Sequence, residues 1–333
     1  MISGIGPLGF GAAAIGNLFR AISDDEAQAT IAAAWTAGLR YFDTAPHYGF
    51  GLSEKRLGEA LALLDPRGEA IISTKVGRRL DPFPEADLHA VRQGFLSPEP
   101  FESRFDYSHD AVMRSHEQSL KRLKRERIDI LYAHDIGRLA HGADHPAQMR
   151  AFLDGGFRAM RRLRDEGAVR AIGIGVNEVA VCEEMLTHAD IDILLLAGRY
   201  TLLQQEPLDR LFPLCVERGV QVVIGGPYNS GILARSAGRD GEAGQAHYEY
   251  GAPPPAIVDR VQRLDALCAS HGVPLGRAAL HFPLRHPVVG TVVAGFAGKD
   301  EVDAAIAHLA EPVPGSLWAA MRDAGLIDPR APV

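Results

Sequence analysis

Eight short apolar segments rich in β-forming residues are spread along the chain, and this repetition is the strongest constraint on its fold. Amphipathic segments with helical spacing separate most of them. A strand, a helix and a second strand in this order favour a right-handed parallel βα unit. Eight such units predict an α/β fold closed as a (β/α)8 TIM barrel. The predicted strands are residues 8–12, 41–45, 70–76, 128–133, 169–176, 191–197, 220–224 and 290–294.

An open, doubly wound dinucleotide-binding sheet is the main alternative architecture. That fold requires a Gly-x-Gly-x-x-Gly turn after its first strand and an acidic residue about 20 residues further on. This chain supplies only Gly9 and Gly11 of the three glycines, and the first acid at a strand end, Asp43, comes later. We therefore reject the doubly wound sheet.

The length of 333 residues suits one large α/β domain or two ordinary ones. The strand count favours a single barrel domain over residues 1–333. Residues 78–107 contain four prolines and several aromatic residues, and residues 236–255 are polar and rich in glycine and proline. Loops this long in a compact domain are usually lids or binding loops. We expect both to lie over the active-site face.

The composition is that of a soluble globular protein, with 47% hydrophobic and 23% charged residues. The net charge of −7 comes from scattered acids, and no nucleic-acid-binding module is visible. No secretory signal begins the chain, and no apolar run reaches the about 18 residues needed for a membrane span. The three cysteines are far apart, which favours buried thiols in a reducing cytosol over a zinc site. We expect a cytoplasmic protein with no metal, membrane or nucleic-acid partner.

Four residues with useful chemistry fall at or just beyond the ends of predicted strands. Asp43 comes directly after an apolar run, and Tyr48 ends the same segment, Tyr-Phe-Asp-Thr-Ala-Pro-His-Tyr. Lys75 lies near the end of the third run, and His134 follows the fourth. The carboxyl ends of barrel strands converge on one face, where catalytic residues are found. We therefore expect the four side chains to be neighbours.

Each of these residues also has a purely structural interpretation. Asp43 can cap a turn and Tyr48 can pack in the core. Lys75 can be a solvated residue at a strand end, and His134 a hydrogen-bonded core histidine. A buried carboxylate is costly unless it is paired. The order of all four residues along successive strands favours catalysis more strongly than any one of them.

The set suits proton transfer at an oxygen whose carbon gains or loses a hydride. A tyrosine with a pKa of about 10 is a poor acid or base at neutral pH. A neighbouring Lys75 ammonium favours the phenolate, and Asp43 can keep that lysine charged. A neutral His134 can donate a hydrogen bond to a carbonyl or alkoxide oxygen. Because side chains supply no hydride, a nicotinamide cofactor is needed.

At these residues the sequence resembles the aldo-keto reductase family, and the similarity covers essentially the whole chain. The shared motifs are the segment at 41–48, Ser-Glu-Lys-Arg-Leu-Gly at 53–58, Ser-Thr-Lys at 73–75, Ser-Leu-Lys-Arg-Leu at 119–123, Ile-Asp-Ile-Leu-Tyr-Ala-His at 128–134 and Gly-Ile-Gly-Val-Asn at 173–177. The resemblance implies a (β/α)8 barrel that binds NAD or NADP across its mouth. It implies that Tyr48, Asp43, Lys75 and His134 form the catalytic tetrad, with Tyr48 as proton donor or acceptor.

The resemblance also implies where the cofactor binds. Asn177 falls where the family holds the nicotinamide carboxamide, and Ala197 stands where many members have Gln. After the seventh strand, Gly-Gly-Pro-Tyr replaces the common Tyr-Ser-Pro-Leu, which removes the tyrosine that usually stacks on nicotinamide. The glycines there can also be plain tight turns. The expected cofactor-binding residues are Asn177, Gly225, Pro227, Asn229, Gly231, Leu233, Gly295, Phe296, Lys299 and Glu301.

Cofactor preference depends on the segment after the eighth strand. Members that prefer NADP usually have an Arg for the 2′-phosphate where this chain has Ala297. Arginine matches phosphate with two hydrogen bonds, whereas Lys299 offers only a point charge. NAD is therefore the expected cofactor, with NADP as the alternative.

Two stretches resemble the sugar-dehydrogenase branch of the family: Gly-Gly-Pro-Tyr-Asn-Ser-Gly-Ile-Leu at 225–233 and Phe-Asp-Tyr-Ser at 105–108. That branch oxidises aldoses such as L-fucose, D-threo-aldoses or L-galactose at C1 to the lactone, so a small sugar or carbonyl substrate is expected. A pyridoxal-oxidising relative is also similar. The remaining alternatives are an NADPH-dependent aldehyde or ketone reductase, a Schiff-base lyase or aldolase that uses Lys75, and a non-catalytic cofactor-binding subunit.

Overall fold

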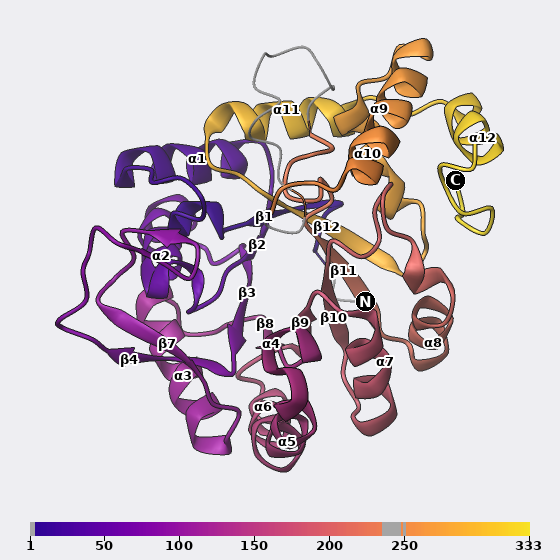
Figure 1. Cartoon of the computed structure of the whole chain (residues 1–333). Coiled ribbons are helices and arrows are strands. Elements are labelled where there is room, and N and C mark those ends of the chain that lie inside the picture. Colours follow the sequence, from indigo (N-terminus) through magenta and orange to yellow (C-terminus); the bar gives the residue numbers. More distant parts are fainter. Residues whose placement is uncertain (1–3, 235–247, 249–250) are drawn as a thin grey trace.

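The computed structural model describes residues 4–234, 248 and 251–333. Its centre is a closed barrel of eight parallel strands in the order β1-β12-β11-β10-β9-β8-β3-β2, surrounded by helices (Figure 1). This confirms the predicted (β/α)8 architecture. The barrel strands are β1 (Leu8–Gly11), β2 (Tyr41–Asp43), β3 (Ile71–Val76), β8 (Ile130–His134), β9 (Ala171–Val176), β10 (Ile193–Ala197), β11 (Gln221–Gly225) and β12 (Val289–Gly295).

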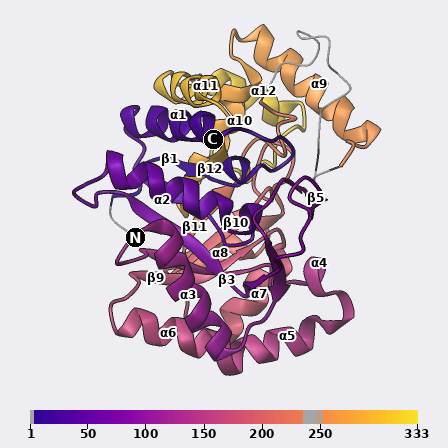
Figure 2. The same ribbon diagram turned by 90° about the vertical axis from the view of Figure 1, so that its left-hand side faces the viewer.

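Helices cover the barrel on opposite sides. In the perpendicular view of Figure 2, α1 and α11 lie on one side of the strands, and α5 and α6 lie on the other. The α-helices are α1 (Asp24–Thr36), α2 (Leu52–Leu64), α3 (His109–Leu123), α4 (Arg138–His141), α5 (His145–Ala151), α6 (Phe157–Asp165), α7 (Val179–His188), α8 (Leu211–Arg218), α9 (Pro255–Ser270), α10 (Leu275–Leu284), α11 (Lys299–Ala310) and α12 (Gly315–Asp323). Short 3-10 helices are η1 (Ala14–Gly16), η2 (Tyr48–Gly51), η3 (Gly142–Asp144) and η5 (Glu206–Leu208), and η4 (Phe152–Gly156) is a π-helix.

Local signals in the sequence explain several helix boundaries. Ser23 caps α1 and forms a capping box with Glu26, as Ser-Asp-Asp-Glu predicts. Ser108 caps α3 by accepting a hydrogen bond from the backbone N–H of Ala111. Between β8 and β9, α5, η4 and α6 form a continuous helical path, and Gly155 and Gly156 lie in its π-helical part.

Alternation along the strands divides their side chains between two apolar clusters. One cluster, which includes Phe10, Phe42 and Ile72, packs between the strands and the helices. The other contains the alternate residues Tyr41, Ile71, Ile130, Tyr132, Ala171, Ile193, Leu195, Val223 and Val293. Successive side chains of a strand point to opposite faces, so this second cluster fills the barrel interior. A fully buried side chain of this size stabilises the fold by about 1.5–3 kcal/mol.

The segment at 78–107 differs from the long loop that the sequence predicts. It forms two antiparallel pairs: β4 (Arg78–Pro82) with β7 (Phe101–Phe105), and β5 (Val91–Arg92) with β6 (Phe95–Leu96). Figure 1 shows β4 and β7 outside the barrel, beside α3. The prolines that suggested a loop lie at the strand end or in the connections, where no ladder hydrogen bond is needed from them. The second predicted loop, 236–255, falls almost wholly outside the described residues.

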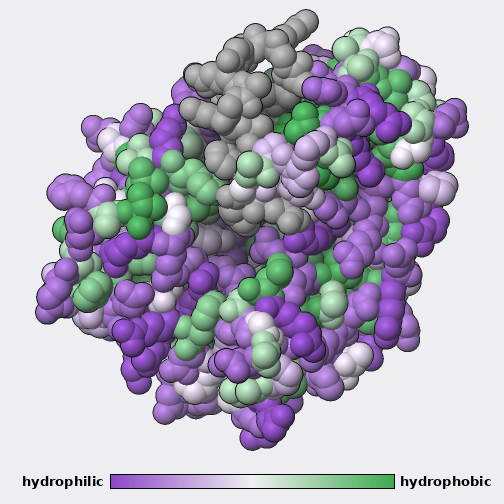
Figure 3. All heavy atoms as spheres, in the orientation of Figure 1, coloured by the Kyte–Doolittle hydropathy of each residue, from purple (hydrophilic) through white to green (hydrophobic). Residues whose placement is uncertain are grey.

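Several apolar side chains are exposed, including Phe19, Phe83, Leu88 and Val91. The face seen in Figure 3 is mostly hydrophilic, with hydrophobic residues in separate patches. None of the helices in the described part of the chain is long and apolar enough to cross a membrane.

Candidate active site

The alternation that fills the barrel also aims four polar side chains into its mouth. Tyr41 faces the interior, so Asp43, two residues later, faces it as well. Lys75 comes four residues after the inward-facing Ile71, and His134 comes four residues after the inward-facing Ile130. An even spacing along a strand returns the side chain to the same face, so both also face the interior. Because β2, β3 and β8 are neighbours in the barrel, their carboxyl ends bring these side chains together.

Asp43 and Lys75 form a buried ion pair. The Nζ of Lys75 donates to Oδ2 of Asp43 at 2.7 Å and to the main-chain oxygen of Thr44 at 2.9 Å. Ser73 donates to the other carboxylate oxygen of Asp43 at 2.6 Å. Burial by itself would lower the pKa of Lys75, but Asp43 and then Tyr48 outweigh it, and the pKa is raised. The lysine is therefore a fixed ammonium.

Tyr48 follows β2 through a tight turn and is held against that ammonium. Its backbone N–H donates to the carbonyl of Ala45 at 3.1 Å. The Nζ of Lys75 lies 4.7 Å from the centroid of the Tyr48 ring, and the two side chains are hydrogen-bonded. Gly16 lies against the backbone of Tyr48, where an ideal Cβ would come within 2.8 Å of its carbonyl carbon. The turn thus fixes the phenol at the mouth.

His134 is buried beside Tyr48, with the two ring centroids 5.8 Å apart. Burial lowers its pKa well below the usual value, and the charges of Lys75 and Arg78 lower it further. The imidazole is therefore neutral at physiological pH and retains one N–H to donate. The hydroxyl of Tyr107 donates to the His134 main-chain oxygen at 2.7 Å, which fixes the end of β8.

These contacts argue against the purely structural interpretations of Lys75 and Asp43. Lys75 is not solvated at a strand end, because its side chain is only 2% exposed. Asp43 does not cap a helix but accepts hydrogen bonds from Lys75 and Ser73. A charged lysine also makes a poor Schiff-base nucleophile, because imine formation requires the free amine.

Sequence reasoning assigned no role to several groups that complete this site. Ser73 orients Asp43, and Tyr107 orients the backbone of His134. His47, directly before Tyr48, is hydrogen-bonded to Ser103 of β7 at 3.0 Å. The sequence signal available for such groups was a polar residue one or two positions from a catalytic candidate at a strand end. Which neighbouring strand that side chain faces depends on the register of the barrel.

The residues expected to bind the cofactor follow the carboxyl ends of β9, β11 and β12, on the same face as the four polar side chains. Asn177 comes directly after β9, and its main-chain oxygen accepts from Arg199 at 2.6 Å. Five of them, Gly225, Pro227, Asn229, Gly231 and Leu233, are in or after the end of β11. The other four, Gly295, Phe296, Lys299 and Glu301, are at or beyond the end of β12.

The segment after β11 offers features that a dinucleotide requires. Asn229 donates through Nδ2 to the carbonyl of Gly198 at 3.2 Å, while its buried Oδ1 has no partner among the described residues. Gly226 and Gly231 have positive φ angles of 58° and 94°, with open space where a Cβ would stand. An unused acceptor and exposed glycine backbone fit an amide or phosphate-bearing ligand. Leu233, by contrast, is fully buried, so it presents no surface to a ligand in this structure.

The segment after β12 is tied up by its own contacts. A carboxylate oxygen of Glu301 accepts from the backbone N–H of Ala297 at 2.8 Å, and Arg20 donates to the Ala297 carbonyl at 2.9 Å. Lys299 is paired with Asp303. The side chain of Phe296 packs in the core, 5.5 Å from the ring of Phe10. The backbone of Ala297 is therefore bonded on its N–H by the Glu301 carboxylate and on its carbonyl by the Arg20 guanidinium.

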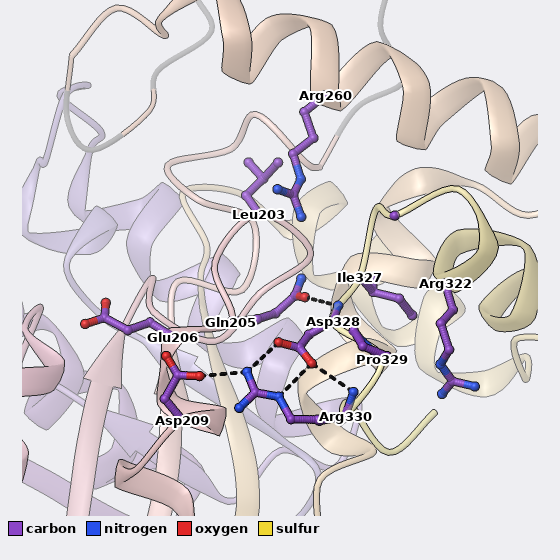
Figure 4. Close-up of a pocket in the computed structure, with 11 residues that line it drawn as sticks. Leu203, Gln205, Glu206, Asp209, Arg260, Arg322, Ile327, Asp328, Pro329 and Arg330 are labelled. Carbon is purple, nitrogen blue, oxygen red and sulfur yellow. Dashed lines mark hydrogen bonds and ion pairs between the residues drawn. The ribbon is translucent and has the colours of Figure 1, made fainter.

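A separate pocket of about 460 Å³ lies away from these residues, between η5 and the C-terminal segment (Figure 4). Its charges largely satisfy one another: Arg330 pairs with Asp209 and Asp328, both at 2.6 Å. Gln205 accepts from the backbone N–H of Asp328 at 2.6 Å. None of the strand-end polar side chains lines this pocket, so we assign it no part in the chemistry.

Comparison with known proteins agrees with this geometry. Residues 7–325 match the model of the Aldo/keto reductase family. The chain is 42% identical over 323 residues to a D-threo-aldose 1-dehydrogenase of Pseudomonas sp, with 96% of this chain and 94% of the relative covered. It is 39% identical over 330 residues to a pyridoxal 4-dehydrogenase of Microbacterium luteolum, with the same coverage.

Among solved structures, the holo form of an aldo-keto reductase from Bacillus halodurans is similar, with a TM-score of 0.73 and 27% identity. The match covers 97% of this chain and 92% of that one. The likeness to an aldose dehydrogenase agrees with the sugar-dehydrogenase branch expected from the sequence. The chain belongs to the aldo/keto reductase family and is an NAD(P)-dependent oxidoreductase.

Proposed function

We propose that this protein oxidises an aldose of the L-fucose, D-threo-aldose or L-galactose type at C1 to the lactone. The observation that carries the proposal is the Lys75 ammonium, which Asp43 holds against the phenol of Tyr48. The similarity to a D-threo-aldose 1-dehydrogenase over nearly the whole chain supports the substrate class. The expected partner is the small-molecule sugar or carbonyl substrate. The three cysteines are buried and form no disulfide, which supports a cytosolic location.

The protein supplies the proton chemistry of the reaction. Tyr48, as phenolate stabilised by Lys75, accepts the proton of the C1 hydroxyl. Neutral His134 donates a hydrogen bond to the same substrate oxygen and orients it. Asp43 and Ser73 keep Lys75 charged and in place. The bound nicotinamide supplies the acceptor for the hydride that leaves C1. Asn177 and the backbone at the ends of β11 and β12 would hold it.

We propose NAD as the preferred cofactor. A 2′-phosphate would meet the Glu301 carboxylate, which already occupies the backbone N–H of Ala297. Of the two cations beside this segment, Lys299 is engaged with Asp303 and Arg20 with the carbonyl of Ala297. A carboxylate instead suits a free ribose hydroxyl, which can donate a hydrogen bond to it. NADP is the alternative.

Pyridoxal oxidation is a second candidate, because the pyridoxal 4-dehydrogenase is similar over the same span. NADPH-dependent reduction of simple aldehydes or ketones uses the same tetrad and remains the third. A panel of aldoses plus pyridoxal, followed at the absorbance band of reduced nicotinamide with NAD and NADP separately, distinguishes them. We expect NAD reduction with L-fucose, L-galactose or a D-threo-aldose. Activity with pyridoxal alone, or oxidation of NADPH by simple aldehydes without aldose oxidation, would replace the proposal.

A further inference from the structure

Two charged side chains outside the tetrad meet beside His134. Arg78 begins β4, three residues after Lys75, and Asp135 directly follows His134. Nη1 of Arg78 donates to Oδ2 of Asp135 at 2.9 Å. The same carboxylate oxygen lies 3.6 Å from Nε2 of His134. The pair therefore adjoins the place where the substrate oxygen must sit.

Both side chains keep unused hydrogen-bonding capacity and partial access to solvent. The exposed fraction is 16% for the Arg78 side chain and 25% for that of Asp135. Within the described residues, only Oδ2 of Asp135 is hydrogen-bonded, which leaves Oδ1 as a free acceptor. Nη2 of Arg78 reaches Gln93 only at 3.5 Å, too long for a strong bond. Within the described residues, one acceptor oxygen of Asp135 and one donor nitrogen of Arg78 thus lack a strong protein partner.

The pair is held rigidly by the surrounding structure. The guanidinium of Arg78 stacks 4.5 Å from the ring of Phe105, its partner in the β4–β7 ladder. Asp135 has a φ of 51°, in the left-handed region, and its backbone N–H donates to the carbonyl of Gly175 at 3.0 Å. Left-handed backbone in a non-glycine residue is strained and tends to persist at functional sites. Asp135 adopts this conformation directly after β8 and pairs there with Arg78.

The environment of Asp135 agrees with a role in ligand binding. Burial raises the pKa of this carboxyl, and the charges of Arg78 and Lys75 oppose that rise without cancelling it. Oδ1 of this carboxylate lacks a hydrogen bond from the described residues. A ligand hydroxyl would supply one.

We propose that the Arg78–Asp135 pair binds a substrate hydroxyl next to the reacting carbon and so selects polyhydroxylated substrates. A hydroxyl can donate to Oδ1 of Asp135 and accept from Nη2 of Arg78 at the same time. An unsubstituted alkyl aldehyde can do neither, and it would desolvate the pair without replacing its bonds with water. This inference rests on the proposed function only because the two share a site. A substrate hydroxyl would be bound in the same way whether the substrate is oxidised or reduced.

The test compares two three-carbon aldehydes, glyceraldehyde and propanal, as substrates for reduction by the reduced cofactor. The measured quantity is the ratio of their kcat/KM values in the wild type and in R78M, D135A and D135N. We expect the wild type to favour glyceraldehyde, and the ratio to fall roughly 10- to 100-fold in R78M and D135A. D135N keeps one acceptor oxygen and should lie between. Propanal turnover in the same variants reports any indirect effect of the substitutions on His134, which the ratio cancels, and cofactor affinity should stay within a few-fold of wild type.

Arg79 provides a matched control in the same hairpin. It forms ion pairs with Asp81 at 3.1 Å and with Asp106 at 3.3 Å. R79M should leave the glyceraldehyde-to-propanal ratio unchanged. The inference is overturned if the wild type does not favour glyceraldehyde, if R78M and D135A slow both aldehydes equally, or if R79M lowers the ratio as much. If the proposed function is wrong, the wild type will oxidise none of the aldoses. The glyceraldehyde-to-propanal ratio can still be measured in that case, so the two failures are distinguishable.

Discussion

Lys75 donates a 2.7 Å hydrogen bond to Asp43 inside the barrel mouth, and their side chains are only 2% and 5% exposed. A buried charge pair is rarely a cheap source of stability, because desolvation offsets most of the attraction between the charges. Its consequence here is chemical: the carboxylate holds a permanent positive charge against the Tyr48 phenol.

Breaking this pair should destabilise the protein. D43N leaves the buried ammonium without its counter-ion, which we expect to cost about 3–5 kcal/mol of unfolding free energy. The matched control is D43N combined with K75M, which removes both charges and should recover part of the loss. Urea unfolding of the three variants at pH 7 measures the difference. Equal stability of D43N and wild type would show that the pair is not the tightly coupled unit described here.

His134 should act as a hydrogen-bond donor and not as a cation. H134L removes the donor and should lower kcat by roughly 10²–10³-fold. H134Q retains an N–H donor of similar reach and should lose much less. Steady-state kinetics of both variants provides the test, with cofactor affinity as the check on folding. Equal losses in the two variants would contradict donation from this side chain.

Stability should fall on acidification. Burial, helped by the charges of Arg78 and Lys75, lowers the pKa of His47 to about 2. The pKa of His134 is lowered as well, with burial again the main cause. Because the unfolded histidines take up a proton near pH 6.5 and the folded ones do not, each loses up to about 1.4 kcal/mol of stability per pH unit below that value. Above pH 6.5 these histidines are neutral in both the folded and the unfolded state, so they add no pH dependence to stability. Below pH 6.5 they lower the stability of the folded state.

Urea midpoints measured from pH 8 to pH 5 test this sign. We expect little change from 8 to 7 and a steady decrease below 6.5. In H47Q, one of the two contributions is removed, so the decrease should be shallower. A midpoint that does not change between pH 7 and pH 5 would be incompatible with neutral, buried histidines.

Cofactor preference should respond to one position after β12. A297R introduces a guanidinium that can bind a 2′-phosphate with two hydrogen bonds. We expect the NADP-to-NAD ratio of kcat/KM to rise by about 10-fold or more, a change of about 1.4 kcal/mol. K299A serves as the control and should change the ratio little, since Lys299 is already paired with Asp303. An unchanged ratio in A297R would place the determinant of preference elsewhere.

The fold was predictable because its signal is repeated eight times along the chain. Each barrel strand is an apolar run, and errors of one or two residues at its ends do not change the strand count. The hairpins at 78–107 were not predictable in the same way. Phe95 of β6 packs on Phe50 and Leu80, and Asn17 bonds to the backbone of Leu96, so distant residues stabilise strands of only two residues.

The site was predictable only in part. Asp43 and His134 end strongly apolar strands and Lys75 is the penultimate residue of another, so their convergence required only the barrel. The roles of Arg78 and Asp135 depend on a left-handed turn and on a hairpin that leaves the barrel at Gly77. An ideal Cβ on Gly77 would come within 2.3 Å of the Tyr107 ring. Such contacts between segments far apart in sequence leave no periodic signal in either segment.

The central claim is that Tyr48 transfers the proton while an aldose loses its hydride at C1. The most direct measurement is the initial rate of NAD reduction by an aldose for wild type and Y48F, together with the NAD dissociation constant of each. We predict a fall in kcat of roughly 10²–10⁴-fold in Y48F with an unchanged dissociation constant. Near-normal turnover in Y48F would contradict the account.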